Sequence, residues 1–269
     1  MINTNIQSKL NAKYNPEGSD LRRAQLNGIK LLEFIDRICT ENNLKYWLDS
    51  GTLLGAMRHG GFIPWDDDID ISMPREDALK LKKIMGSKVF DGHIMLQSTE
   101  TDDYYIHSSW ITLRDLKTEY VVETNFNESK FRGLQIDIFM VDNKSPYVSR
   151  KFIALLNKYF VELPLLRFKS KILHRCSFGL FKLIDRHLVP LFRIFKRESD
   201  VYSRSIGCTW YKPEFKRDIL FPLKTITFEN HEFSCPNDSD KYLQIIYGDW
   251  MTVPDDKDIQ THNATFKFL

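Results

Sequence analysis

A short acidic run carries the clearest chemistry in the sequence, Trp65-Asp66-Asp67-Asp68-Ile69-Asp70-Ile71. If the chain from Asp68 onward is a strand, Asp68 and Asp70 project from one face about 7 Å apart, because strand side chains alternate. Asp137, in an alternating run from Gln135 to Phe139, can add a third carboxylate from a neighbouring strand. Oxygen ligands without thiolates favour Mg²⁺ or Mn²⁺. A solvated acidic turn stays open as the alternative for an isolated acidic motif.

A candidate anion site precedes the acidic run. Gly51-Thr52 follows a short expected strand at Lys45 to Asp49 and begins an expected helix from Thr52 to Arg58. Backbone N–H groups at a helix start suit phosphate. Beside a carboxylate cluster, this arrangement indicates a metal-assisted nucleotide or phosphoryl site, although an ordinary turn has the same local sequence.

Several further side chains are candidates for contacts with a phosphorylated substrate. Arg58 and Arg114 could clamp phosphate oxygens, and a structural ion pair is the alternative for each. His59 and His262 could donate to phosphate or move protons, and a structural hydrogen bond is the alternative. Asp66 ranks above its neighbour Asp67 as a further ligand, because it has the strand parity of Asp68.

Helical and alternating segments are mixed along the chain, which favours an α+β (mixed α/β) fold with a mixed sheet flanked by helices. The expected helices span Asp20 to Cys39, Arg75 to Met85 and Asp240 to Tyr247. Expected strands are Asp66 to Met73, Leu134 to Val141 and Thr225 to Phe228, with Tyr105 to Arg114 and Thr118 to Glu123 as a pair.

Charge divides the 269 residues unevenly. The net charge is +2, yet residues 144–204 hold 14 Lys+Arg against 4 Asp+Glu. We therefore expect a loose tail at 1–19, a catalytic core at 20–143, a basic amphipathic helical insert at 144–204, and a segment at 205–269 that completes the core. The sequence favours neither of two interpretations of the insert. It contacts an anionic membrane, or it packs against the core with its charges solvated.

Composition limits the function classes. No apolar run reaches the roughly 18 residues of a membrane span, and no signal peptide is visible at the start of the sequence. The four cysteines are far apart, as expected for reduced thiols in a cytoplasm. No nucleic-acid module accompanies the basic region, so no nucleic-acid partner is expected.

Residues 48–70, LDSGTLLGAMRHGGFIPWDDDID, resemble the signature of the LicD family, which includes the fukutin-type enzymes within the nucleotidyltransferase superfamily. The resemblance extends to Arg114, to Ile136-Asp137-Ile138-Phe139 and, near the end of the chain, to Tyr247-Gly248-Asp249 and His262. By that resemblance, Asp68 and Asp70 match the metal-binding pair, Asp137 the third carboxylate, and Gly51-Thr52 the glycine motif. Donor-binding candidates are Gly51, Thr52, Arg58, His59, Trp65, Asp66, Arg114 and His262.

The resemblance implies metal-dependent transfer of a phospho-alcohol from a CDP-activated donor to a sugar hydroxyl of a cell-surface glycan or glycolipid. CDP-choline is the favoured donor, Mg²⁺ or Mn²⁺ the expected cofactor, and the cytoplasm, including the inner face of the plasma membrane, the expected location. Choline would need aromatic side chains around its ammonium group, and Trp47, Trp65, Trp110 and Trp250 are candidates. A glycosyltransferase that uses a nucleotide sugar and a non-catalytic membrane-docking protein remain as alternatives.

Overall fold

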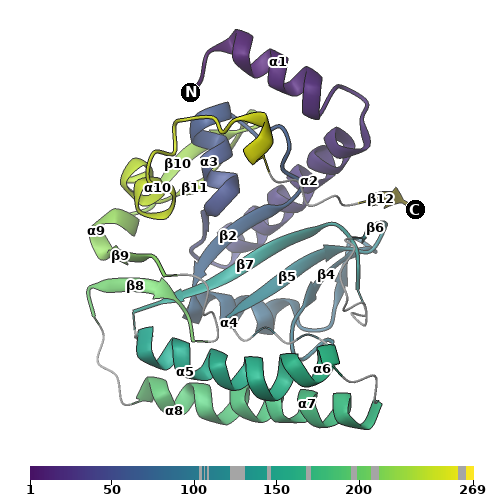
Figure 1. The fold of residues 1–269 in the computed structure, drawn as a ribbon, viewed down its shortest axis with the longest axis vertical. Helices are drawn as coiled ribbons and strands as arrows, with labels where there is room; N and C mark the ends of the chain where they lie inside the picture. Colours follow the sequence, from purple (N-terminus) through teal and green to yellow (C-terminus); the bar gives the residue numbers. More distant parts are fainter. Residues whose placement is uncertain are drawn as a thin grey trace.

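A mixed sheet forms the centre of the protein (Figure 1). A computed structural model describes residues 1–102, 105, 107, 109–121, 131–143, 147–167, 171–194, 199–206, 212–259 and 265–269. The sheet has the strand order β1-β2-β7-β5-β4-β3, and β8 extends it by pairing with β7 and β9. Its strands are β1 Trp47–Leu48, β2 Ile69–Pro74, β3 Val89–Phe90, β4 Ile94–Gln97, β5 Trp110–Asp115, β7 Gln135–Asp142, β8 Val201–Arg204 and β9 Glu214–Lys216.

The strands β2 and β7 run parallel, whereas the other neighbours in this sheet pair antiparallel. One face is apolar because Ile69 and Ile71 of β2 lie beside Ile136 and Ile138 of β7. Helices α2 (Asp20–Glu41) and α4 (Arg75–Met85) pack against this sheet and contribute to one core. The predicted mixed α/β fold is therefore confirmed, and the opposite sheet face is left for polar side chains.

Two smaller ladders complete the strand pairing. β10 (Lys224–Phe228) pairs with β11 (His231–Cys235), and β6 (Thr118–Val121) pairs with β12 (Thr265–Phe268). The prediction that the strands around residues 115–117 pair with each other is wrong. β5 instead pairs with β4 and β7, because Ile111 and Leu113 take places in the buried apolar face between those strands.

Several further helical segments are short. They are α3 (Ser50–His59), α9 (Arg217–Leu220), α10 (Ser239–Tyr247) and the 3₁₀ turn η3 (Asp256–Asp258). The expected loose tail contains a further helix, α1 (Thr4–Tyr14), whose first turn is capped by the Asn3 side chain. Tyr14 fixes its end, since its ring packs against Trp65 and its hydroxyl donates to Asp256. Those partners are distant in sequence, so local pattern gave no sign of them.

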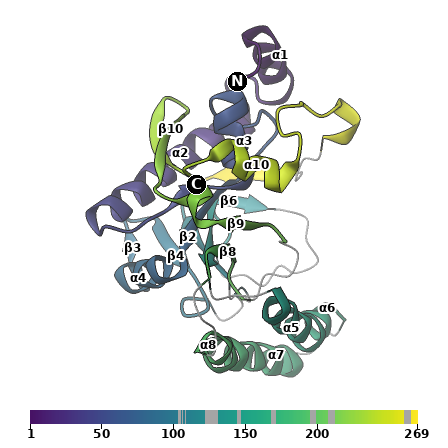
Figure 2. The same cartoon turned by 90° about the vertical axis from the view of Figure 1, so that its left-hand side faces the viewer.

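The basic segment forms a helical hairpin at one end of the molecule (Figures 1 and 2). Its first arm is α5 (Tyr147–Asn157), η1 (Lys158–Glu162) and α6 (Leu163–Arg167); its second is α7 (Lys171–Leu183), η2 (Ile184–Leu188) and α8 (Val189–Ile194). Both η1 and η2 are π-helical turns just before Pro164 and Pro190, which lack the N–H that would continue the α-helical ladder. The expected boundary at 204 needs correction, because Val201–Arg204 is strand β8 of the sheet.

None of the helices in the described part of the chain is long and apolar enough to cross a lipid bilayer.

Candidate active site

A row of polar side chains crosses four strands on the face opposite the apolar core. Asp70 of β2 is the register partner of Asp137 on β7. Asp137 is in turn opposite Thr112 of β5, and Thr112 is opposite Gln97 of β4. Register partners project from the same face, so the two carboxylates lie side by side on neighbouring strands. The Thr112 hydroxyl donates to Asp137 Oδ1 over 2.8 Å. The structure thus brings together two of the three predicted metal ligands.

The third predicted ligand lies just outside the strand. β2 begins at Ile69, so Asp68 belongs to the turn that enters the strand. Oxygen atoms of Asp66, Asp67 and Asp68 all lie within 4.8 Å of one another, an arrangement that can also hold a metal ion. Asp68 is therefore common to two carboxylate groups, the predicted one and one made by the turn.

The carboxylates of this site oppose one another electrostatically. Burial raises the pKa of Asp70 well above its usual value, and the charges of Asp68 and Asp137 raise it further. Burial, followed by the charge of Asp68, likewise raises the pKa of Asp66. Burial also raises the pKa of Asp137, while the charge of Arg114 acts in the opposite direction. A bound divalent cation would offset this repulsion, so the oxygen-rich set suits Mg²⁺ or Mn²⁺.

The start of α3 lies directly against Asp70. Asp49 caps the helix by accepting from the Ser50 N–H over 2.7 Å, and Thr52 Oγ1 accepts from the Asp70 N–H over 2.8 Å. The chain turns at Ser50, whose φ of 46° lies in the left-handed region, one residue before the predicted Gly51-Thr52 motif. Gly51 serves another purpose: a Cβ atom there would stand 2.7 Å from Asp66 Oδ2. Glycine thus allows the acidic turn to approach the positive end of the helix.

A buried network that sequence reasoning missed holds this helix start. Asp49 Oδ2 accepts from Ser72 Oγ over 2.5 Å and from Arg204 Nη2 over 3.0 Å, and Asp49 Oδ1 accepts from the Tyr242 hydroxyl over 2.6 Å. The Arg204 guanidinium carbon lies 3.1 Å from the centroid of the Phe139 ring. All four polar side chains are almost fully buried. The pairing of β8 with β7 places Arg204 beside Asp49, and a single sequence gives no signal for this strand pairing.

Arg114 lies on the same face as the polar row, two residues from Thr112 on β5. Its Nε donates to Gln97 Oε1 over 2.8 Å, and its Nη1 donates to the Gly133 carbonyl over 3.0 Å and to Gln135. Burial lowers the pKa of the Arg114 guanidinium, while the charge of Asp137 acts in the opposite direction. The predicted phosphate clamp is therefore close to the carboxylates and fixed by neutral oxygen acceptors.

Three other predicted residues lie at the opposite end of α3. Arg58 is eight residues beyond the helix start, about 12 Å along the axis. Its Nη1 donates to the carbonyls of Trp250 and Thr252, and its Nε donates to His59 Nε2 over 2.9 Å. Trp65 packs edge-on against the His59 ring. The geometry thus gives these residues structural contacts, the alternative that the sequence left open for Arg58 and His59.

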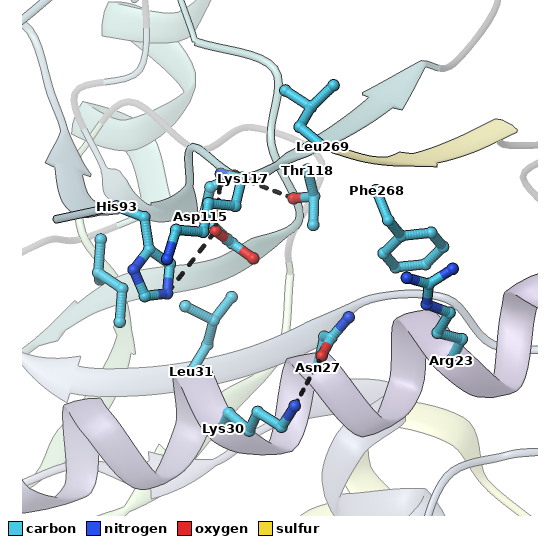
Figure 3. Close-up of a pocket in the computed structure, with 11 residues that line it drawn as sticks. Arg23, Asn27, Lys30, Leu31, His93, Asp115, Lys117, Thr118, Phe268 and Leu269 are labelled. Atoms are coloured by element: carbon cyan, nitrogen blue, oxygen red, sulfur yellow. Dashed lines mark hydrogen bonds and ion pairs between the residues drawn. The ribbon is translucent and has the colours of Figure 1, made fainter. Parts of the chain in front are cut away.

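Of the remaining candidates, His262 lies outside the described residues. A hollow of about 250 Å³ between α2 and the β5–β6 turn is a separate feature (Figure 3). Asp115 lines it, because it follows Arg114 on β5 and points to the other face. Its Oδ1 accepts from the Lys117 N–H over 2.9 Å and lies 4.0 Å from His93 Nε2. None of the predicted site residues that the structure describes lines this hollow.

Comparison with known proteins gives one family match and several relatives. Residues 43–178, half of the chain, match the family described as LicD/FKTN/FKRP, nucleotidyltransferase domain. The lipopolysaccharide cholinephosphotransferase LicD of Haemophilus influenzae is 26% identical over 277 residues, covering 93% of this chain and 98% of that protein. The uncharacterized protein RP689 of Rickettsia prowazekii is 50% identical over 56 residues, covering 21% of each chain. Ribitol 5-phosphate transferase FKRP of Homo sapiens is 44% identical over 45 residues, covering 17% of this chain and 9% of that protein.

Proposed function

This chain belongs to the LicD family, and from that premise we propose that it transfers a phospho-alcohol from a CDP-activated donor to a sugar hydroxyl of a cell-surface glycan precursor. Two of its relatives are named as phosphotransferases, for choline phosphate in lipopolysaccharide and for ribitol 5-phosphate. The chain is accordingly an enzyme of the phosphotransferase class. The observation that carries the proposal is the carboxylate pair Asp70–Asp137 beside the start of α3.

Asp68, Asp70 and Asp137 would hold Mg²⁺ or Mn²⁺. The fit rests on the chemistry of the donor set, which consists of carboxylate oxygens only: Asp70 and Asp137 share one sheet face, and Asp68 lies in the turn before β2. Burial and the charges of Asp68 and Asp137 raise the pKa of Asp70. When bound, the metal ion offsets the negative charge of the donor diphosphate and of the leaving phosphate. Asp66 and Asp67 belong to the alternative ligand group with Asp68.

The protein's own groups position the remaining parts of the donor. The backbone N–H groups that follow Ser50 in the first turn of α3 suit the diphosphate, because such groups have no partners within a helix, and Thr52 holds that turn against Asp70. The acceptor hydroxyl attacks the phosphorus that bears the alcohol, the bond from this phosphorus to the bridging oxygen breaks, and CMP leaves. Asp137, oriented by the Thr112 hydroxyl, accepts the proton of the acceptor hydroxyl.

Choline is the favoured alcohol, since the relative that spans nearly the whole chain is named for it. Among the tryptophans considered for an ammonium site, Trp47 and Trp250 are buried in the core and Trp65 lies at the far end of α3. Trp110 is half-buried, lies on the same face as Thr112, and packs against Phe139 at a centroid distance of 5.7 Å. Trp110 is therefore the tryptophan best placed for cation–π contact with choline.

Substitution of single acids separates the two carboxylate groups. We expect Asp137→Asn to abolish Mg²⁺-dependent release of CMP from CDP-choline, and Asp67→Asn to retain most of it. The reverse result would assign the metal to the Asp66–Asp68 turn and remove Asp137 from the mechanism. Nucleotide sugars serve as the donor control, because turnover of one of them in place of CDP-alcohols would favour a glycosyltransferase.

A further inference from the structure

The helical hairpin of residues 147–194 buries some of its apolar side chains apart from the main core. Two small clusters of buried side chains join its arms and are separate from the main core. They contain Ile153, Ile184, Val189 and Ile206 in one case, and Val161, Phe178 and Phe181 in the other. The buried apolar side chains of the arms thus pack against one another and against Ile206, which follows β8. Any other apolar residues of the arms must face elsewhere.

A second apolar stripe of the first arm faces solvent. Phe152, Tyr159 and Phe160 are 47%, 58% and 56% exposed. Phe152 and Tyr159 are seven residues apart, two helical turns, and therefore share one side of the arm. Lys151 and Lys158 have the same seven-residue spacing and are also exposed, so a row of positive charge borders the aromatic stripe.

The second arm repeats this arrangement. Ile172 and Ile194, near its two ends, are 77% and 74% exposed, and Leu183 between them is 59% exposed. Arg175 and Arg186 are exposed on the same arm. Of the 18 large hydrophobic side chains that are exposed in the described part of the chain, ten lie on this hairpin. Such concentration marks an interaction surface, whereas single exposed apolar residues are ordinary.

Charge identifies the partner. Residues 147–194 contain ten Lys+Arg and two Asp+Glu, whereas the whole chain is nearly neutral. Two of the basic residues attach the hairpin to the core: Arg150 pairs with Glu214, and Arg193 pairs with Glu76 and Asp142. The basic residues of the two exposed stripes lie at the surface with the apolar side chains: Lys151, Lys158, Arg175 and Arg186. Apolar and aromatic residues bordered by cations fit the headgroup region of an anionic bilayer.

We propose that the hairpin of residues 147–194 docks on an anionic lipid bilayer, with Phe152, Tyr159 and Phe160 in the boundary between headgroups and acyl chains. Its end position in the molecule leaves the hairpin accessible to a flat surface (Figures 1 and 2). This inference goes beyond the proposed chemistry and does not depend on which donor is used. Neither arm is both long and apolar enough to cross the bilayer, so the proposed contact is at its surface.

Flotation with lipid vesicles tests the proposal on the full chain. We expect binding to vesicles of phosphatidylcholine mixed with phosphatidylglycerol, and little binding to phosphatidylcholine alone. The double variant Tyr159→Ser/Phe160→Ser should bind about tenfold more weakly or less, since it removes two aromatic side chains from the contact. Val89→Ser is the matched control, because Val89 is 49% exposed but lies on the core, and it should bind like the wild type.

A charge-reversal pair tests the electrostatic part. Lys151→Glu/Lys158→Glu should lose binding by about tenfold or more, whereas Lys83→Glu/Lys88→Glu, exposed on the core, should not. Circular dichroism of each variant checks that the helices remain. Failure of the wild type to float with anionic vesicles would overturn the proposal. So would a dimer in light scattering that the Tyr159→Ser/Phe160→Ser variant abolishes, because a second copy would then cover this surface.

Discussion

Arg204 gives the sharpest test of how the site is held. Its side chain is 1% exposed, donates to Asp49 and Ser50, and lies on the Phe139 ring. We consider Arg204→Met, which keeps an unbranched side chain of similar length and removes the charge. The substitution leaves the carboxylate of Asp49, which is 0% exposed, without its cationic partner.

The expected loss in free energy of unfolding follows from the burial of this ion pair. Removing one partner of a buried ion pair costs about 3–5 kcal/mol, because the remaining charge is desolvated and uncompensated. Ser72 and Tyr242 still donate to Asp49 in the variant, so we expect the lower end, about 3 kcal/mol. Adding Asp49→Asn removes the stranded charge, and the double variant should recover at least about 1 kcal/mol of that loss.

Urea denaturation of the wild type, both single variants and the double variant measures these free energies of unfolding. Lys267→Met is the control, because its partner is the Glu119 carboxylate at an exposed position, and it should leave the midpoint almost unchanged. A loss below about 1 kcal/mol for Arg204→Met, or strictly additive effects of Arg204→Met and Asp49→Asn, would refute the view that this pair fixes the start of α3.

Three further outcomes follow from the geometry. Gly51→Ala should lower donor turnover about tenfold or more, because the new Cβ would stand 2.7 Å from Asp66 Oδ2. Gly179→Ala is the control: a Cβ there has no heavy atom within 4 Å, so turnover and the urea midpoint should not change. Thr112→Val should lower kcat about tenfold with little change in urea midpoint, since it removes the hydroxyl that orients the β7 carboxylate. Burial and the charge of Arg58 lower the pKa of His59 to about 3, so the folded protein keeps it neutral while the unfolded chain protonates it near pH 6.5. Stability should therefore fall as pH drops from 6.5 towards 3, by up to about 1.4 kcal/mol per pH unit, and urea curves of His59→Gln should lack that contribution.

Local pattern predicted the elements that carry the carboxylates. The alternation from Gln135 onward gave β7, and the apolar residues between the acids gave β2 within three residues of its start. The helix expected from Arg75 to Met85 has those bounds in the structure. In each case one face of the element is buried in the main core, so the spacing of apolar residues along the sequence shows which face is buried.

Contacts between distant segments could not be predicted in this way. β12 pairs with β6 across more than a hundred residues, and β8 brings Arg204 from beyond the hairpin to the start of α3. Arg58 shows the same limit: its residue type suits phosphate, and the sequence left a structural role open, but its guanidinium donates to the carbonyls of Trp250 and Thr252. Residue type indicates what a side chain can bind, whereas the fold decides what is within its reach.

Whether this chain uses a CDP-alcohol donor is decided by release of CMP from CDP-choline by the purified protein, with Mg²⁺ present or removed by EDTA. CDP-ribitol and CDP-glycerol serve as parallel donors, and calorimetry measures donor binding in case turnover awaits the acceptor. We expect metal-dependent CMP release, or metal-dependent donor binding, that Asp70→Asn abolishes. Neither turnover nor binding of any CDP donor, or activity that persists without metal and in Asp70→Asn, would contradict the proposed function.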